Sequence, residues 1–160
     1  MESVETLHIV PITMSQANQY AKEHNEHYHA FRGHLFAIGC AAEGKLAGVV
    51  IVGQPSSKEL NDGQTLVVSY ICTTKGRIAY GMLYGAAARA AKAMGHHRIV
   101  GFIPEDRSDS GLRAAGWKRV GLVEDHAPGR ICYEQRFGAR HQRRKKRIED
   151  QDQIRPACIS

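Results

Sequence analysis

A short basic turn, Lys75-Gly76-Arg77, is the part of the sequence whose residue types most directly suggest chemistry. It follows an apolar, β-branched run at residues 66–72 that is typical of a buried strand, and it precedes an alanine-rich stretch, residues 80–94, that predicts a helix. The first N–H groups of a helix have no internal partner and carry partial positive charge. Together with two cations they favour binding of a phosphate or pyrophosphate. An ordinary strand-to-helix crossover with solvated Lys and Arg side chains is the alternative interpretation.

Two common nucleotide-binding motifs are absent from the sequence around this turn. There is no Gly-x-x-x-x-Gly-Lys-Ser/Thr, which argues against a P-loop nucleotide triphosphatase. There is no Gly-x-Gly-x-x-Gly after the strand, which argues against a Rossmann dinucleotide site.

A histidine-rich segment, His-Asn-Glu-His-Tyr-His at residues 24–29, is the second candidate for chemistry. On a helix, His24, His27 and Tyr28 would share one face. Two histidines at that spacing can bind zinc, but no third ligand follows as in HExxH. A role beside the substrate and simple solvation are the other two interpretations. Histidine is also the natural general base near neutral pH, so His24 and His27 are the candidate bases.

The elements that must position these residues alternate strands with helices. Ser15 is the expected N-cap of the first helix, and a Glu-Gly-Lys turn at residues 43–45 predicts a hairpin between two apolar runs. The expected strands cover residues 7–12, 31–42, 46–52, 66–72, 98–103, 118–124 and 131–137, with a short helix at 111–115.

Composition and cysteine usage indicate one soluble globular domain. The chain has 160 residues, of which 42% are hydrophobic, and it holds no apolar run long enough to cross a membrane. Its four cysteines form no CxxC pair and no zinc-like spacing. We expect them to be reduced, which predicts a cytoplasmic location, without metal or membrane.

The positive charge is concentrated in the last part of the chain. The net charge is +6, and residues 138–160 contain seven Lys or Arg against three Asp or Glu. We therefore expect a domain over residues 1–137 and a basic, flexible tail over 138–160. The segment from Arg140 to Arg147 is the candidate for a weak contact with nucleic acid.

The order of elements resembles that of the GNAT superfamily of N-acetyltransferases over residues 7–125. The basic turn with its alanine-rich helix resembles that family's acyl-coenzyme A motif, and LRAAGW at residues 112–117 resembles its late helix ending in Gly-aromatic. GHLFAIG, LAGVVIVG and LYGAAARAAKAMG resemble a subfamily of N-acyltransferases often encoded by phages and mobile elements. The resemblance implies an α/β (α+β) fold with a mixed, largely antiparallel sheet flanked by helices, around a central strand-turn-helix unit for acyl-CoA.

The resemblance also implies a set of residues for acetyl-CoA or another acyl-CoA. Tyr70 is the candidate proton donor to the departing thiolate, and its alternative role is packing on the helix. Backbone N–H groups of the strand end, near Ile71 to Thr73, are the candidate oxyanion donors. The candidate cofactor-binding residues are Ile71, Cys72, Thr73, Lys75, Gly76, Arg77, Ile78, Ala79, Tyr80 and Gly81.

Several positions depart from the family pattern. Ile78 and Tyr80 stand where the usual turn has small residues, with Gly81 one position late. Leu112 stands where the family has its tyrosine acid, and the strand before the turn carries no Glu. The catalytic residues therefore cannot be carried over from the family.

Three functions follow as hypotheses. The first is direct acyl transfer from coenzyme A to an amine of a small-molecule or macromolecular acceptor. The second is modification of a DNA or RNA base by a GNAT-fold protein that the basic tail recruits. The third is a non-catalytic adaptor that keeps the fold without the chemistry.

Overall fold

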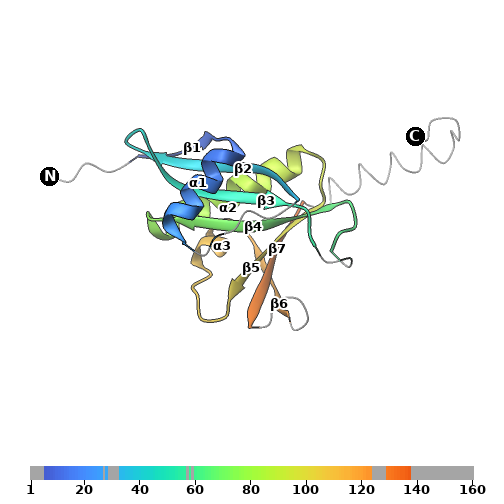
Figure 1. Ribbon diagram of the computed structural model, residues 1–160. Helices are drawn as coiled ribbons and strands as arrows, with labels where there is room; N and C mark the ends of the chain where they lie inside the picture. The colour runs from blue at the N-terminus through green and yellow to red at the C-terminus, as the bar shows by residue number, and fades with distance from the viewer. Residues whose placement is uncertain are drawn as a thin grey trace, which may run out of the picture.

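The computed structural model describes residues 6–26, 28, 33–56, 58, 60–123 and 129–137 (Figure 1). His27 and the tail at 138–160 lie outside the described residues. The elements in chain order are β1 (Leu7–Pro11), α1 (Met14–His24), β2 (His34–Ala42), β3 (Lys45–Gly53), β4 (Thr65–Thr73), α2 (Gly76–Ala93), β5 (Arg98–Pro104), α3 (Ser110–Ala114), β6 (Lys118–Val123) and β7 (Arg130–Arg136).

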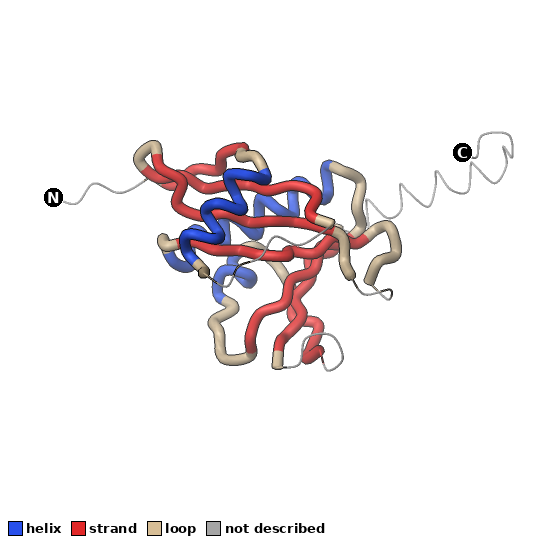
Figure 2. Tube along the Cα trace, in the orientation of Figure 1, coloured by secondary structure: helices blue, strands red, loops and turns tan. Residues whose placement is uncertain are grey.

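The described strands form one sheet of seven, in the order β1-β2-β3-β4-β5-β7-β6 (Figure 2). Every neighbouring pair is antiparallel except β4 and β5, which are parallel and joined through α2. This confirms the expected mixed, largely antiparallel sheet with a central strand-turn-helix unit. The predicted hairpin is β2–β3, and its turn has positive φ at both Glu43 (53°) and Gly44 (77°), as a tight hairpin turn requires.

Helices cover the two faces of the sheet (Figure 2). Alternate residues of β3 show this directly, because Val50 and Val52 pack in the core under α2 and α3, whereas Val49 and Ile51 pack under α1. The alanines of α2 have small side chains, which lets this helix lie close to the sheet. The central strands are therefore buried on both faces, and a site can form only at their ends or where the sheet opens.

Two helix starts differ from the sequence predictions. The N-cap of α1 is Thr13, not Ser15: the Thr13 hydroxyl accepts a bond from the Gln16 N–H, and the Gln16 side chain accepts one from the Thr13 N–H. This capping box explains the earlier start. Helix α2 begins at Gly76, four residues before the predicted start, so the basic turn is itself the first turn of the helix.

Close packing of α3 on α2 gives a stability prediction. A methyl group on Gly111 would lie 2.7 Å from Tyr80 Cβ and 3.3 Å from Gly81 N. Because backbone must move to relieve this contact, we expect Gly111→Ala to lower the free energy of unfolding by about 1–3 kcal/mol, measured by urea denaturation. Gly85→Ala on α2 is the control, since its new methyl meets only the movable Nη1 of Arg89 at 3.2 Å. It should raise stability by about 0.5–1 kcal/mol; equal stability of the two variants would contradict this packing.

Candidate active site

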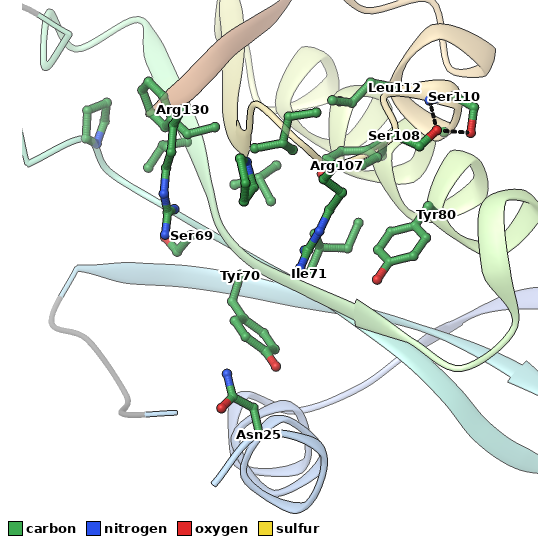
Figure 3. A pocket seen from close by; sticks show the side chains of 18 of the residues that line it. Asn25, Ser69, Tyr70, Ile71, Tyr80, Arg107, Ser108, Ser110, Leu112 and Arg130 are labelled. Atoms are coloured by element: carbon green, nitrogen blue, oxygen red, sulfur yellow. Dashed lines mark hydrogen bonds between the residues drawn. The ribbon is translucent and has the colours of Figure 1, made fainter. Parts of the chain in front are cut away.

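A cleft opens where β4 and β5 stop pairing. The two strands are in register only from Thr65 and Arg98 to Val67 and Val100, although β4 runs on to Thr73. Beyond that point the strands diverge, and residues of α2, of the β5–α3 connection and of β7 complete the walls (Figure 3). The cavity measures about 770 Å³. That is the size of a pocket for a small substrate.

A bulge in β4 faces this opening. Ile51 of β3 pairs with Tyr70 and Val52 pairs with Val68, so Ser69 between them has no partner on β3. Bulges redirect backbone and side chains, often beside active sites. On its other edge, β4 has no partner strand among the described residues after its three pairs with β5. Ser69 also lines the cleft, so backbone without a partner on β3 borders the cavity.

The three strand-end residues predicted to bind the cofactor have different surroundings. Ile71 lines the cleft, whereas Cys72 packs in the cluster under α1. The Thr73 hydroxyl donates to the Ala47 carbonyl at 2.7 Å and accepts from the Lys75 N–H at 3.1 Å, so it fixes the path from strand to helix. Of the three, only Ile71 faces the cavity.

The basic turn lies at the exposed N-terminus of α2, as the sequence predicts. Gly76 has a φ of 74°, which side chains rarely adopt, so glycine is required there. Lys75 is the N-cap and makes no side-chain capping bond among the described residues. The first N–H groups of this 18-residue helix carry the partial positive charge of the helix dipole, and no described side chain caps them. A groove of about 460 Å³ runs beside this end, lined by Arg77, Ile78, Gly81, Met82, Ser110 and Ala114.

The remaining predicted cofactor residues divide between groove, cleft and core. Arg77 lines both cavities, Ile78 is 68% exposed at the groove, and Gly81 forms part of the groove wall. Tyr80 points into the cleft (Figure 3). Ala79 is fully buried in the core, so its side chain does not face either cavity.

Tyr70 lines the cleft and also packs against the cluster under α1, and it remains a candidate for proton donation. Burial, followed by the nearby Cys72, raises the pKa of Tyr70 to about 12. Its ring meets Tyr28 edge-on with centroids 4.7 Å apart, and Asn25 lies beside its hydroxyl (Figure 3). The phenol is therefore protonated at every physiological pH, and the raised pKa also makes it a weaker acid than an exposed tyrosine.

The histidine segment is only partly described. His24 is the last residue of α1; its Nδ1 lies 2.9 Å from the Tyr20 carbonyl, and its ring stacks on Tyr20 with centroids 3.9 Å apart. His24 is exposed and does not line the cleft, although the next residue, Asn25, does. His27 lies outside the described residues, so its role as a base stays a prediction from sequence.

Two arginines of the cleft were not predicted from sequence. Arg107 comes from the β5–α3 connection and Arg130 begins β7, and both side chains project into the cavity (Figure 3). They are 23 positions apart in polar turns of the chain, so no local pattern marks them as partners. Only the antiparallel pairing of β5 with β7, which sets Pro104 opposite Arg130, brings these turns together.

Metal and membrane features are limited in the part of the chain that the structure describes. Within it, no group of three or more His, Cys, Asp or Glu side chains is placed to hold a metal ion. None of the described helices combines the length and apolar character needed to cross a membrane.

Solved structures with the same arrangement of elements decide the fold. An acetyltransferase of the GNAT family from Streptococcus pneumoniae aligns over 82% of this chain and 100% of its own, with a TM-score of 0.57 and 12% identity. The chain has the GNAT acetyltransferase fold. Ribosomal-protein-S5-alanine acetyltransferase from Vibrio fischeri aligns over 84% of this chain and 95% of its own, with a TM-score of 0.59 and 15% identity. A Bacillus subtilis acetyltransferase in complex with CoA aligns over 84% of this chain and 100% of its own, with a TM-score of 0.53 and 14% identity. No model of a protein family matches the sequence, and no curated protein matches it.

Proposed function

We propose that this protein transfers an acyl group from acyl-coenzyme A to an amine. The observation that carries the proposal is the continuity between the cleft and the basic helix N-terminus, because Arg77 lines both the cleft and the adjoining groove. The N-terminus of α2, with Lys75 and Arg77, suits the pyrophosphate of the coenzyme. The groove and cleft suit the arm that ends in the thioester. Coenzyme A would supply the acyl group in activated form.

The residues of the cleft provide two of the interactions that acyl transfer needs. Backbone N–H groups around Ser69, which has no partner on β3 and lines the cleft, would stabilise negative charge on the thioester oxygen. The Tyr70 hydroxyl, whose pKa is raised to about 12, is available to protonate the leaving thiolate. The walls of the cleft hold both reactants together, which favours a direct transfer.

Removal of a proton from the acceptor is favoured by the charge of the cleft. Among the described residues, its lining includes three arginines and no Asp, Glu or His. Like charges disfavour a bound ammonium relative to the neutral amine, so any arginine charge that bound anions leave unneutralised would lower the pKa of the acceptor amine. His24, which ends α1 one residue before the cleft-lining Asn25, is a candidate base for the released proton, and His27 stays a candidate from sequence alone.

The direct test is release of coenzyme A thiol from acetyl-CoA in the presence of a panel of amines, with the acylated product identified by mass spectrometry. Amine-dependent thiol release with one acyl group added per thiol would support the proposal. Binding of acetyl-CoA with no transfer to any amine would favour the adaptor hypothesis instead.

Truncation of the basic tail separates the small-molecule and nucleic-acid hypotheses. Phe137 must be kept, because its side chain is buried and its N–H donates to the His97 carbonyl at 3.1 Å. We expect a chain ending at Phe137 to retain its thermal stability, acetyl-CoA affinity and turnover on small amines. Loss of turnover from a folded, truncated protein, together with DNA or RNA binding that falls steeply with salt in the full chain, would favour nucleic acid as the partner.

A further inference from the structure

The cleft carries a charge imbalance that acyl transfer alone does not explain. Arg77 lies at the helix N-terminus and is assigned to the coenzyme. Arg107 and Arg130 reach the same cavity from other parts of the fold, and no described lining residue is acidic. Three cations and no described carboxylate leave the cavity lining positively charged, which favours an anionic ligand over a neutral or cationic one.

Neither Arg107 nor Arg130 has a carboxylate partner among the described residues, in contrast to neighbouring arginines. Arg98 and Arg136 both contact Glu134, at 3.4 and 3.0 Å. Arg113 Nε lies 2.9 Å from Asp109 Oδ2. Among the described residues, the fold thus supplies carboxylates to several arginines of this region but none to Arg107 or Arg130.

Arg130 lies at the end of the cleft where the acceptor, and not the coenzyme, would bind. In Figure 3, Arg130 lies beside Ser69 at one end of the cleft, whereas Tyr80 and Ser110 lie at the end next to α2. Arg107 projects between these ends. A coenzyme bound at the α2 N-terminus would enter from the Tyr80 side, so Arg130 faces whatever enters from the other.

We propose that the acceptor is a small amine that itself carries an oxyanion, a carboxylate or a phosphonate, and that Arg130 binds this group with support from Arg107. The proposal rests on the proposed function. The planar guanidinium fits both oxyanions through paired N–H···O bonds. The bound anion would also orient the amine toward the thioester. A cavity of about 770 Å³ fits such a compound beside the coenzyme arm better than a polymer.

The test compares matched amines with full-length wild-type protein, Arg130→Gln, Arg107→Gln and the control Arg89→Gln, which removes an exposed cation of α2 outside the cleft. Each set contains an amino acid, the aminoalkylphosphonate of the same length and the corresponding neutral amide. We expect kcat/KM at least tenfold higher for an anionic member. Arg130→Gln should remove about tenfold to hundredfold of that preference by raising the KM for the amine, with the KM for acetyl-CoA unchanged.

Ligand-observed NMR binding of the same compounds without acetyl-CoA makes the result independent of turnover. The preferred anion, carboxylate or phosphonate, identifies the source of the oxyanion. Equal use of neutral and anionic amines, or equal effects of Arg130→Gln and Arg89→Gln, would overturn the proposal and leave acyl transfer standing. Absence of acetyl-CoA binding would instead refute acyl transfer, and the NMR arm would still decide whether Arg130 binds the anion. Binding of a short oligonucleotide in place of the small anions would also overturn the proposal.

Discussion

Tyr70→Phe is expected to lower kcat about 100-fold while leaving the affinity for acetyl-CoA unchanged. A positioned general acid typically raises the rate of reaction about 10²–10⁴-fold. The low end of this range applies here because a thiolate is a good leaving group. Removing one hydroxyl keeps the ring that packs against Tyr28. Stopped-flow thiol release and calorimetric titration of acetyl-CoA would measure the two quantities.

The control for this variant is Tyr28→Phe, which removes the neighbouring phenol hydroxyl outside the cleft. That hydroxyl donates to Asn18 Oδ1 at 2.7 Å, so its loss should affect stability more than turnover. Because the pKa of Tyr70 is raised to about 12, its proton stays in place up to about pH 11, and Tyr70 should contribute no loss of kcat between pH 6 and 10. Equal turnover of Tyr70→Phe and Tyr28→Phe would remove Tyr70 from the mechanism.

The double substitution Lys75→Ala with Arg77→Ala is expected to weaken coenzyme A binding about tenfold to hundredfold at low salt. Hydrogen bonds to a charged phosphate contribute more to the binding free energy than hydrogen bonds between neutral groups. Both side chains lie at the exposed N-terminus of α2. At about 0.5 M salt the difference should shrink, because ions screen exposed charges. Calorimetric titrations at two salt concentrations measure both effects.

Arg89→Ala with Lys92→Ala is the matched control, since it removes the same charge from exposed positions nearer the other end of α2. It should leave the dissociation constant nearly unchanged at both salt concentrations. If the two double variants weakened binding equally, the pyrophosphate would have to lie away from the basic turn.

Much of the fold could be predicted from local patterns. The apolar β-branched run at β4, the basic turn and the alanine-rich α2 each carry their own signal, and the Glu-Gly-Lys turn specifies the β2–β3 hairpin. The helix starts were harder, because Thr13 and Ser15 are both good N-caps and only the reciprocal bonds with Gln16 distinguish them. The resemblance to a subfamily encoded by phages and mobile elements, the tail as a separate unit and a cytoplasmic location stay predictions from sequence.

The site was less predictable because it depends on where two strands separate. No residue type marks the end of the β4–β5 pairing after Val67, yet that end creates the cleft. Arg107 and Arg130 come together only through the pairing of β5 with β7, which links distant turns. The predicted role of Tyr80 in cofactor binding stays a prediction from sequence, and its side chain lines the cleft.

The most direct test of the central claim is a calorimetric titration of the full chain with acetyl-CoA, coenzyme A and ATP. The basic N-terminus of α2, open to the groove and cleft, should bind acetyl-CoA and coenzyme A with micromolar dissociation constants. ATP offers phosphates but no arm to fill the cleft, and the chain has no Walker motif, so ATP should bind far more weakly. Micromolar binding of ATP with no binding of acetyl-CoA would contradict the assignment of this cleft to acyl transfer.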